Sequence, residues 1–489
     1  MQEDLLTTVM NLGSPSVLVA GDFMLDIYIY GDALRISPEA PVPVLKVTGT
    51  EYRCGGAGLV AADLAALGAI PYCLGVIGDE ADRNGTILRS QLADAGADTT
   101  ALLPAAGRET ITKQRVVGLA QHRHPQQLIR IDQELAEPFS DEQYARLLQL
   151  YKSVLSKVDI VCLQDYNKGL LSPALCREMI RLAAKAGKRL LVDPCLTSDY
   201  SKYVGATVIT PNRKEASQAV GFEIKDTKAA AEAADQLLAQ CRLDAVVITL
   251  DKEGAYLQST DGGQLVPTKP RSVYDVTGAG DMVLATLTAA LAAGYDYQTA
   301  VQLANVTGGM EVEKFGSATI TVEEIINEIS GKVLATDGLL SRLTWHRRQD
   351  KTIVFTNGCF DVVHRGHIEY LKFCKGQGDI VVVGLNSDNS VRTIKGPERP
   401  INNEHDRAAV LAALEAVDYI TVFDEPTPLD LIKKVKPDVL VKGEDWAEKG
   451  VVGREFVESH GGKVVLAPLV EGKSSTATIQ KMNSLTKSP

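Results

Sequence analysis

The segment Asp275-Val276-Thr277-Gly278-Ala279-Gly280-Asp281 decides how the first half of this chain folds. An extended run precedes it and an Ala- and Leu-rich stretch, residues 282–293, follows it, so the pattern predicts a glycine-rich turn that opens a helix. Glycine lets backbone N–H groups crowd toward a ligand, and the first N–H groups of a helix have no partner within it. Because a helix N-terminus also carries partial positive charge, the sequence predicts an anion site at Gly278, Ala279 and Gly280.

Asp281 is the unexpected residue of this turn, because its carboxylate would repel a bound phosphate. An acid at this position is useful if it takes the proton from a hydroxyl group that attacks the phosphate. The alternative interpretation is an ordinary glycine-rich loop, in which Asp281 is a favourable first-turn residue. The rest of the chain has to decide between the two.

The composition excludes several classes of protein. A length of 489 residues is too great for one hydrophobic core, so we expect two or three domains. The formal net charge of −11 argues against a general nucleic-acid binder, although a phosphate-handling enzyme can be acidic overall. The eight cysteines are scattered without a C-x-x-C pair, which favours reduced thiols in a cytoplasm over a zinc site or a disulfide framework.

Nothing in the sequence predicts a membrane partner. The first twelve residues lack the basic start and apolar centre of a signal peptide. A membrane-spanning helix needs about twenty consecutive apolar residues, and the sequence contains no such run.

Two α/β domains are predicted from the order of the segments. Short apolar runs alternate with amphipathic segments over residues 1–330, the pattern of a parallel sheet covered by helices. Three extended stretches, 28–46, 110–117 and 128–132, are expected to form a small side sheet. The composition changes near Ser330; residues 331–350 are predicted to be a connector, and 351–489 a smaller mononucleotide-binding α/β domain.

A second phosphate-related motif of the first half is Asn212-Arg213-Lys214-Glu215, which follows the apolar run ATVITP. It places an amide and a carboxylate on one turn near the end of a strand, an arrangement that suits water-mediated Mg²⁺ binding through Glu215. The alternative is a solvated helix start with no ligand.

Together, Gly55-Gly56, Asn212 to Glu215 and DVTGAGD resemble the ribokinase-type (pfkB) carbohydrate kinases over roughly residues 10–325. The resemblance implies a ribokinase-like α/β domain with a small β-sheet lid that often dimerises, and phosphorylation of a sugar hydroxyl by ATP with Mg²⁺. It makes Asp281 the catalytic base and the turn before it the anion hole. It also implies sugar-binding positions at Asp22, Asp26, Gly55 and Gly56.

Two positions depart from that resemblance. Leu59 stands where the family usually has an asparagine that can bond a sugar hydroxyl. Cys195 stands where related sequences carry lysine, and the loss of that cation can alter the contacts to a phosphate. Arg115 and Lys168 remain as candidate ligands of a substrate phosphate, although either can be a solvated surface cation.

The second half contains its own phosphate motif, NGCFDVVHRGH at residues 357–367, between a predicted strand and a predicted helix. His364 and His367 flank a glycine, so both imidazoles can face a phosphate at the helix start and donate hydrogen bonds to it. Two incidental histidines are the alternative. A zinc site is disfavoured because no further Cys or His lies at metal-site spacing.

Further polar and basic segments follow this motif in order. Together with it they resemble the cytidylyltransferase-like nucleotidyltransferases over roughly residues 350–485, a family with a Rossmann-like fold. The resemblance implies that the histidines bind nucleotide phosphates while an acceptor phosphate attacks and pyrophosphate leaves. The predicted nucleotide- and phosphate-binding positions are Asn357, Gly358, Cys359, Phe360, Asp361, Asn386, Asp388, Lys395, Arg399, Lys442, Ser475 and Thr476.

The order of both motif sets resembles the bacterial family that joins a heptose 7-phosphate kinase to a heptose 1-phosphate adenylyltransferase. This resemblance implies ATP as a substrate of both reactions, Mg²⁺ as cofactor, small-molecule partners and ADP-heptose as product. Alternatives remain: a different sugar phosphate, CTP in the second half, or a first half that only dimerises and senses sugar. The intact Asp281, Asn212 and Glu215 argue against the last.

Overall fold

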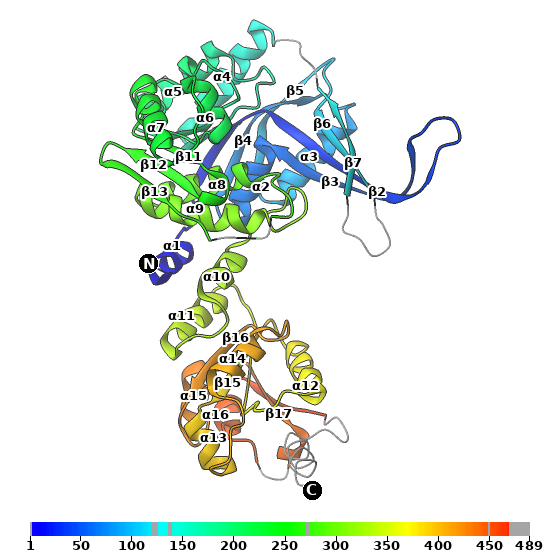
Figure 1. Ribbon diagram of the computed structural model, residues 1–489, viewed down its shortest axis with the longest axis vertical. Helices are drawn as coiled ribbons and strands as arrows, with labels where there is room; N and C mark the ends of the chain where they lie inside the picture. Colours follow the sequence, from blue (N-terminus) through cyan, green and yellow to red (C-terminus); the bar gives the residue numbers. More distant parts are fainter. Residues whose placement is uncertain are drawn as a thin grey trace. The chain divides into compact units, whose positions relative to one another are not determined.

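The computed structural model describes residues 2–118, 126–134, 139–269, 271, 273–447 and 450–468. It consists of two compact units, Met1–Ile326 and Asn327–Pro489 (Figure 1). Both units are α/β, as predicted. No helix among the described residues combines the length and the apolar character that crossing a membrane requires.

A large sheet forms the centre of the first unit. Its strand order is β13-β12-β11-β10-β9-β8-β1-β4-β5, with β12 and β13 antiparallel at one edge and the others parallel. The middle strands are short apolar runs buried along their length, because helices cover both faces. The strands are β1 (Ser16–Gly21), β4 (Ile70–Gly78), β5 (Asp98–Ala105), β8 (Ile160–Gln164), β9 (Leu190–Asp193), β10 (Val208–Ile209), β11 (Ala245–Thr249), β12 (Ala255–Ser259) and β13 (Gly262–Val266).

Two groups of helices cover this sheet (Figure 1). One face packs against α4 (Asp141–Leu155), α5 (Pro173–Lys185) and α7 (Thr227–Cys241). Helices α2 (Ala57–Ala66), α8 (Ala279–Ala292) and α9 (Tyr297–Glu311) pack against one another on the other face. The other described α-helices of this unit are α1 (Gln2–Met10), α3 (Arg83–Asp94) and α6 (Arg213–Val220), and α10 (Val322–Ser330) continues past its end at Ile326.

The predicted side sheet is present beside the main one (Figure 1). Its order is β3-β2-β6-β7, formed by β2 (Phe23–Ile36), β3 (Pro43–Gly56), β6 (Ile111–Gly118) and β7 (Gln126–Gln133). Its first two strands are longer than predicted, so Asp22, Asp26 and the Gly55–Gly56 pair lie where the side sheet joins the main sheet.

Five parallel strands form the second unit's sheet in the order β16-β15-β14-β17-β18. They are β14 (Ile353–Gly358), β15 (Ile380–Asn386), β16 (Tyr419–Phe423), β17 (Val439–Gly443) and β18 (Lys463–Ala467). The order reverses at β14, since β15 lies on one side of it and β17 on the other. Ligands bind at such a switch point, outside the carboxyl ends of the strands. The described helices here are α11 (Thr336–Arg347), α12 (Arg365–Lys375), α13 (Asp388–Lys395), α14 (Glu404–Ala412), α15 (Leu429–Val435) and α16 (Arg454–Ser459).

Two details differ from the sequence-based description. The compact units divide between Ile326 and Asn327, and α11, placed in the predicted connector, buries Leu339 and Leu343 in the core of the second unit. Helix α13 occupies a stretch for which no helix was predicted. It begins because the Ser387 side chain accepts a hydrogen bond from the Ser390 N–H, an N-cap that short-range periodicity does not show.

Candidate active sites

The glycine-rich turn opens α8 as predicted. Gly278 is the N-cap residue with φ of 92°, a left-handed conformation that glycine adopts without strain. A Cβ atom at this position would lie 2.2 Å from Glu311 Oε1, so the turn has no room for a side chain. The first backbone N–H groups of α8, from Ala279 onward, therefore form a helix N-terminus suited to an anion.

Asp281 lies in the first turn of α8 and is only 5% exposed. Gln164 Nε2 donates to its Oδ1 at 2.7 Å, and the Tyr166 hydroxyl lies 3.1 Å from both carboxylate oxygens. Burial raises the pKa of Asp281 to about 7, against the opposing effects of the Tyr166 hydrogen bond and the Lys113 ammonium. A carboxyl group with this pKa can accept a proton near neutral pH.

A pocket of about 470 Å³ surrounds this carboxyl group. It brings together residues that the sequence analysis took from separate motifs: Asn212, Glu215, Gly278, Gly280 and Asp281. It lies at the carboxyl ends of β8 and β9, which contribute Gln164 and Asp193 to its wall. A concave site with convergent polar groups is the expected form of a small-molecule site.

Asn212 and Glu215 form a reciprocal capping box at the start of α6. The Asn212 side chain accepts from the Lys214 and Glu215 N–H groups at 3.0 Å, and Glu215 Oε2 accepts from the Asn212 N–H at 2.8 Å. The two residues therefore do start a helix, as the alternative interpretation of this motif expects. Both residues nonetheless face the pocket, whereas Arg213 is tied to two other carboxylates, Asp251 and Glu253.

Two carboxyl groups, those of Asp193 and Glu215, line this pocket together. No group of three or more His, Cys, Asp or Glu side chains with metal-binding geometry occurs among the residues described. Burial and the neighbouring Glu215 raise the pKa of Asp193, and burial raises that of Glu215. A cation between these carboxyl groups would relieve their repulsion, and Mg²⁺ usually keeps several waters and takes its other ligands from phosphates.

The predicted sugar-binding carboxylates lie on the side-sheet side of this pocket. Asp22 Oδ2 accepts from the backbone N–H groups of Tyr166 and Lys168 at 3.0 and 3.1 Å, and burial raises the pKa of Asp22 to about 6. Gly56 adopts φ of 55°, and a Cβ atom there would lie 2.5 Å from the Asp22 carbonyl oxygen. Its glycine therefore allows β3 to approach Asp22 closely.

The two predicted phosphate cations occupy different surroundings. Arg115 is buried and paired with Asp26 at 3.0 Å, and the Ser317 hydroxyl also donates to Asp26. Lys168 forms an ion pair with Glu134 and lines a second, smaller pocket beside Asp22.

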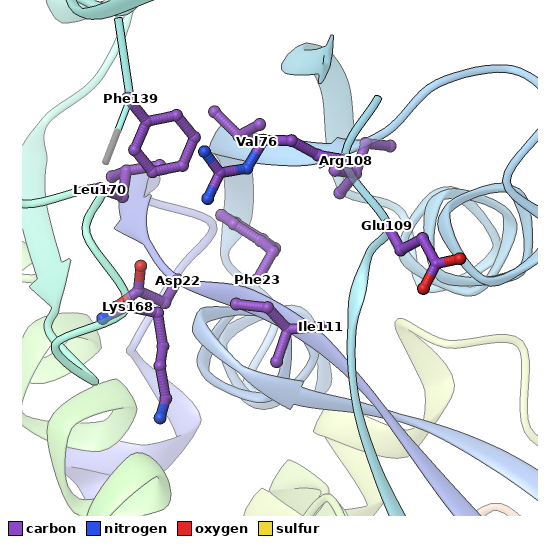
Figure 2. Close-up of a pocket in the computed structure, with 10 residues that line it drawn as sticks. Asp22, Phe23, Val76, Arg108, Glu109, Ile111, Phe139, Lys168 and Leu170 are labelled. Carbon is purple, nitrogen blue, oxygen red and sulfur yellow. The ribbon is translucent and has the colours of Figure 1, made fainter. Parts of the chain in front are cut away.

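Figure 2 shows this smaller pocket. The Arg108 guanidinium group lies 4.1 Å from the centre of the Phe139 ring, with Val76 and Leu170 nearby. The sequence analysis did not single out Arg108 or Phe139, because each is an isolated residue of its type in a loop. Arg108 is thus a second cation, after Lys168, in the lining of the pocket beside Asp22.

Leu59 and Cys195, the two residues that differ from the kinase pattern, are both buried. Leu59 is buried and packs toward Gly278: a Cβ atom at that glycine would lie 3.0 Å from Leu59 Cδ2. Cys195 is buried beside Tyr203, whose hydroxyl bonds Asp165 at 2.8 Å. Lys202 pairs with the same Asp165 at 2.5 Å, so a cation from another element lies in this neighbourhood.

The histidines of the second unit lie together at the start of α12. The centres of the two imidazole rings are 4.0 Å apart, and the ring planes are nearly parallel. His364 is the N-cap residue, and His367 lies in the first turn. Burial and the adjacent His364 lower the pKa of His367 to about 4, so this imidazole is neutral near pH 7. A neutral imidazole still donates one N–H to a phosphate.

A lysine and a tryptophan occupy the neighbouring strand end. Lys442, at the end of β17, donates to the Asn357 carbonyl at 3.1 Å, and burial lowers its pKa to about 8. Its ammonium lies 5.3 Å from the centre of the Trp446 ring, which is 36% exposed. Lys442 thus lies at the carboxyl end of β17, beside β14, and the chain from the end of β14 leads to the histidines. The fold predicts a ligand at this switch point.

Asp361 and Arg399, two of the predicted phosphate-binding positions, lie in one network of side-chain contacts. Asp361 is buried, pairs with Arg399, and accepts from the Ile401 and Asn402 N–H groups at 2.7 and 3.0 Å. Arg407 is also buried and donates to the Cys359 carbonyl at 2.6 Å and to Asp388 at 2.7 Å.

The other predicted positions of this unit are spread over its carboxyl edge. Phe360 packs on His367, Asn386 donates to Ser390, and Lys395 is exposed at the end of α13. Gly358 ends β14, and its neighbour Cys359 is half-buried. Ser475 and Thr476 lie outside the described residues.

Sequence reasoning missed Gln164, Tyr166, Asp193 and Lys113 around Asp281. Each comes from a segment distant from the motif it contacts: Gln164 is 117 positions from Asp281. A polar residue ending a predicted buried strand, as Gln164 ends β8, is the signal that was present.

Comparison with family models matches both halves. Residues 14–324 match the pfkB family of carbohydrate kinases, and residues 355–468 match the cytidylyltransferase-like family. Solved structures similar to this chain include a ribokinase from Arabidopsis thaliana, with a TM-score of 0.50 and 19% identity over 65% of this chain and 99% of that one. Phosphofructokinase-2 from Escherichia coli has a TM-score of 0.52 and 18% identity over 65% and 98%. These likenesses show the fold of the first unit.

Full-length relatives match both halves together. The bifunctional protein HldE of Geobacter metallireducens is 44% identical over 96% of this chain and 95% of its own length. The HldE protein of Geobacter sulfurreducens is 45% identical, covering 96% of both chains. That of Methylobacillus flagellatus is 44% identical over 99% of this chain and 100% of its own.

Proposed function

This chain belongs to the HldE family of bifunctional proteins, and we propose from that membership and from its two sites that it catalyses two steps toward ADP-heptose. The kinase half transfers the γ-phosphoryl group of ATP to the anomeric hydroxyl of D-glycero-β-D-manno-heptose 7-phosphate. A separate phosphatase then removes the 7-phosphate. The nucleotidyltransferase half transfers the adenylyl group of ATP to the heptose 1-phosphate, which gives ADP-heptose and releases pyrophosphate.

The observation that carries the kinase step is the position of Asp281 in the first turn of α8. Its carboxylate takes the proton of the sugar hydroxyl as the hydroxyl oxygen attacks the γ-phosphorus and ADP leaves. Gln164 and Tyr166 hold that carboxylate in place by donating hydrogen bonds to its oxygens. The N–H groups of Gly278 to Gly280 face the phosphoryl oxygens, on which charge builds up in the transition state.

The acidic wall of the kinase pocket supports a role for Mg²⁺. Asp193, Asn212 and Glu215 would hold the hydrated ion, which supplies positive charge to the ATP phosphates. Without a cation, these carboxyl groups would oppose the binding of a polyphosphate to the same pocket.

The surroundings of Asp22 support a phosphorylated sugar as the acceptor. Lys168 and Arg108 line the pocket beside Asp22, and Arg115 forms an ion pair with Asp26. A sugar that extends from Asp281 past Asp22 would bring a distal phosphate toward these cations. Binding of that phosphate would draw Lys168 away from Glu134.

The second step needs no base. The acceptor phosphate is already an anion, so positioning and charge stabilisation suffice. One of its oxygens attacks the α-phosphorus of ATP, and the bond from that phosphorus to the pyrophosphate oxygen breaks. His364, His367 and Lys442 donate hydrogen bonds to the phosphates as charge shifts to the leaving group.

We also propose that the side sheet joins two copies of the chain. Its strands β3 and β7 carry large apolar side chains in contact with solvent: Val47, Ile129 and Ile131 are 55%, 56% and 48% exposed. Sedimentation equilibrium of the whole chain should give a dimer, and Ile129→Asp should give a monomer.

Both proposed reactions use ATP, which supports a cytoplasmic location.

A product assay on the whole chain tests the two reactions. Incubation with ATP, Mg²⁺ and D-glycero-β-D-manno-heptose 7-phosphate should give the 1,7-bisphosphate by mass, and added phosphatase should lead to ADP-heptose. If ADP-heptose forms only from supplied heptose 1-phosphate, the first unit acts on another sugar. If CTP replaces ATP in the second step with higher kcat/KM, the nucleotide assignment is wrong.

A further inference from the structure

The carboxyl edge of the second sheet extends beyond the histidine site. Strands β14, β15 and β16 are consecutive neighbours, paired at Gly358 with Leu385 and at Asn386 with Phe423. Neighbouring strands lie about 4.8 Å apart, so the end of β16 lies roughly 10 Å from the end of β14. A sugar ring with its phosphate is of this size.

A pocket of about 540 Å³ lies at the ends of β15 and β16. We call it the β15–β16 pocket. Its lining is mostly polar: Ser387, Asp388, Asn389, Arg392, Glu404, His405, Val422 and Asp424. It contains neither histidine of the α12 site, so it is a separate cavity beside that site.

Hydrogen bonds hold the carboxylates of this pocket in place. Asp424 accepts from the Ser387 hydroxyl and from Asn389 Nδ2. Glu404 Oε2 accepts from the Asp388 N–H at 2.8 Å. Fixed carboxylates with remaining acceptor capacity are suited to hydroxyl donors, of which a sugar presents several.

Arg407 couples the pocket to the histidine loop. Its buried guanidinium group donates to the Cys359 carbonyl, five residues before His364, and to the Asp388 side chain. Because one planar group holds both segments, the distance between the pocket and the histidines is constrained.

The opposite flank of the histidines has a different character. Lys442 and the partly exposed Trp446 ring lie at the end of β17, on the other side of β14. An aromatic face suits a nucleotide base, whereas the β15–β16 pocket offers no aromatic side chain other than the His405 imidazole. The two flanks therefore favour different halves of the reaction.

We propose that the β15–β16 pocket binds the sugar ring of the sugar 1-phosphate acceptor, with Glu404 and Asp424 accepting hydrogen bonds from its hydroxyl groups. This inference rests on the proposed nucleotidyl transfer and deepens it. The acceptor phosphate then points toward β14, where its oxygen attacks the α-phosphorus beside the histidines. Glu404 and Asp424 are specificity residues that read hydroxyls, and they take no part in bond making.

Steady-state kinetics of the whole chain test this assignment. Asp424→Asn and Glu404→Gln are measured with D-glycero-β-D-manno-heptose 1-phosphate and ATP varied in turn. We expect the KM for the sugar phosphate to rise about tenfold or more, since a lost hydrogen bond to a charged group is worth about 1.5–3 kcal/mol. The KM for ATP should change less than twofold, and kinase activity of the same samples should be unchanged.

A matched control and a second ligand distinguish recognition from a structural effect. Glu415→Gln alters an exposed acid before β16, at the opposite end of that strand, and should change neither KM. The variants should lose less activity with mannose 1-phosphate, which lacks one hydroxymethylene group of the heptose, than with the heptose 1-phosphate.

Unchanged KM for the sugar phosphate in both variants, or a parallel rise in both KM values, would overturn the assignment while leaving nucleotidyl transfer intact. A wild-type chain that makes no ADP-heptose from supplied heptose 1-phosphate would refute the proposed function, and this inference with it.

Discussion

In the proposed function, the two units bind phosphate with the same structural element and use it for different chemistry. In each, a helix begins at the carboxyl edge of a parallel sheet and presents its N-terminus to an anion: α8 in the first unit and α12 in the second. The first turn of α8 carries a buried carboxylate, whereas that of α12 carries two stacked imidazoles. The incoming nucleophile explains the difference, because a sugar hydroxyl must lose a proton and an acceptor phosphate has none to lose.

Asp281→Asn should have the largest effect, because it removes the proton acceptor of one unit alone. Kinase kcat should fall about 10²- to 10⁴-fold, the usual range for a general base. Nucleotidyl transfer by the same sample should stay within twofold of wild type. Measuring both activities on one preparation makes each the folding control of the other, and loss of both would contradict independent sites.

His367→Ala should give the reverse pattern. Removal of a hydrogen-bond donor to a phosphate that gains charge in the transition state lowers kcat by about 10²- to 10³-fold. The kinase should be unaffected. His460→Ala, an exposed histidine directly after α16, serves as the matched histidine control and should retain nucleotidyl transfer within twofold. A His367→Ala enzyme with normal transferase turnover would remove the imidazole from the mechanism.

Gly278→Ala tests whether the turn itself forms the anion site. The added Cβ would lie 2.2 Å from Glu311 Oε1 at a positive φ, so the turn must shift and misplace its N–H groups. Kinase kcat/KM for ATP should fall about 10- to 100-fold. Gly338→Ala, in α11 of the other unit, is the control, because a Cβ there meets nothing within 4 Å. Equal losses in the two variants would argue against this steric explanation.

The pH dependence should also separate the two reactions. Because burial raises the pKa of Asp281 to about 7, the carboxyl group is increasingly protonated below pH 7 and cannot accept a proton. Kinase kcat/KM should therefore fall toward low pH, to about one tenth of its plateau at pH 6. His367, with its pKa lowered to about 4, stays neutral over this range and adds no such limb to the transferase profile. Identical acid limbs in both activities would contradict the assignment.

Tyr166→Phe should have the smallest effect and sharpen the same profile. The Tyr166 hydroxyl bonds both Asp281 oxygens, and this bond lowers the pKa of Asp281. Its loss should move the acid limb of kinase kcat/KM to higher pH and reduce activity at pH 7 about threefold. An unchanged limb, measured between pH 5.5 and 9, would show that Tyr166 does not tune the carboxyl group.

Much of the fold follows from local patterns. Short apolar runs such as SVLVAG and IVCLQ are buried strands, and the helix that follows DVTGAGD begins at the predicted turn. Helix α13 and the packing of α11 were beyond this reasoning. The first depends on one N-cap hydrogen bond, and α11 has no clear apolar stripe in its sequence, although Leu339 and Leu343 are buried.

The sequence by itself determined which chemistry each unit can perform, because a glycine turn with an acid and a helix start with two histidines are local motifs. Only the tertiary structure decided what surrounds them. Gln164 and Tyr166 reach Asp281 across more than a hundred positions, and Arg407 joins Cys359 to Asp388. Such contacts depend on which strands become neighbours, and the packing of the whole sheet, rather than any short segment, fixes that order.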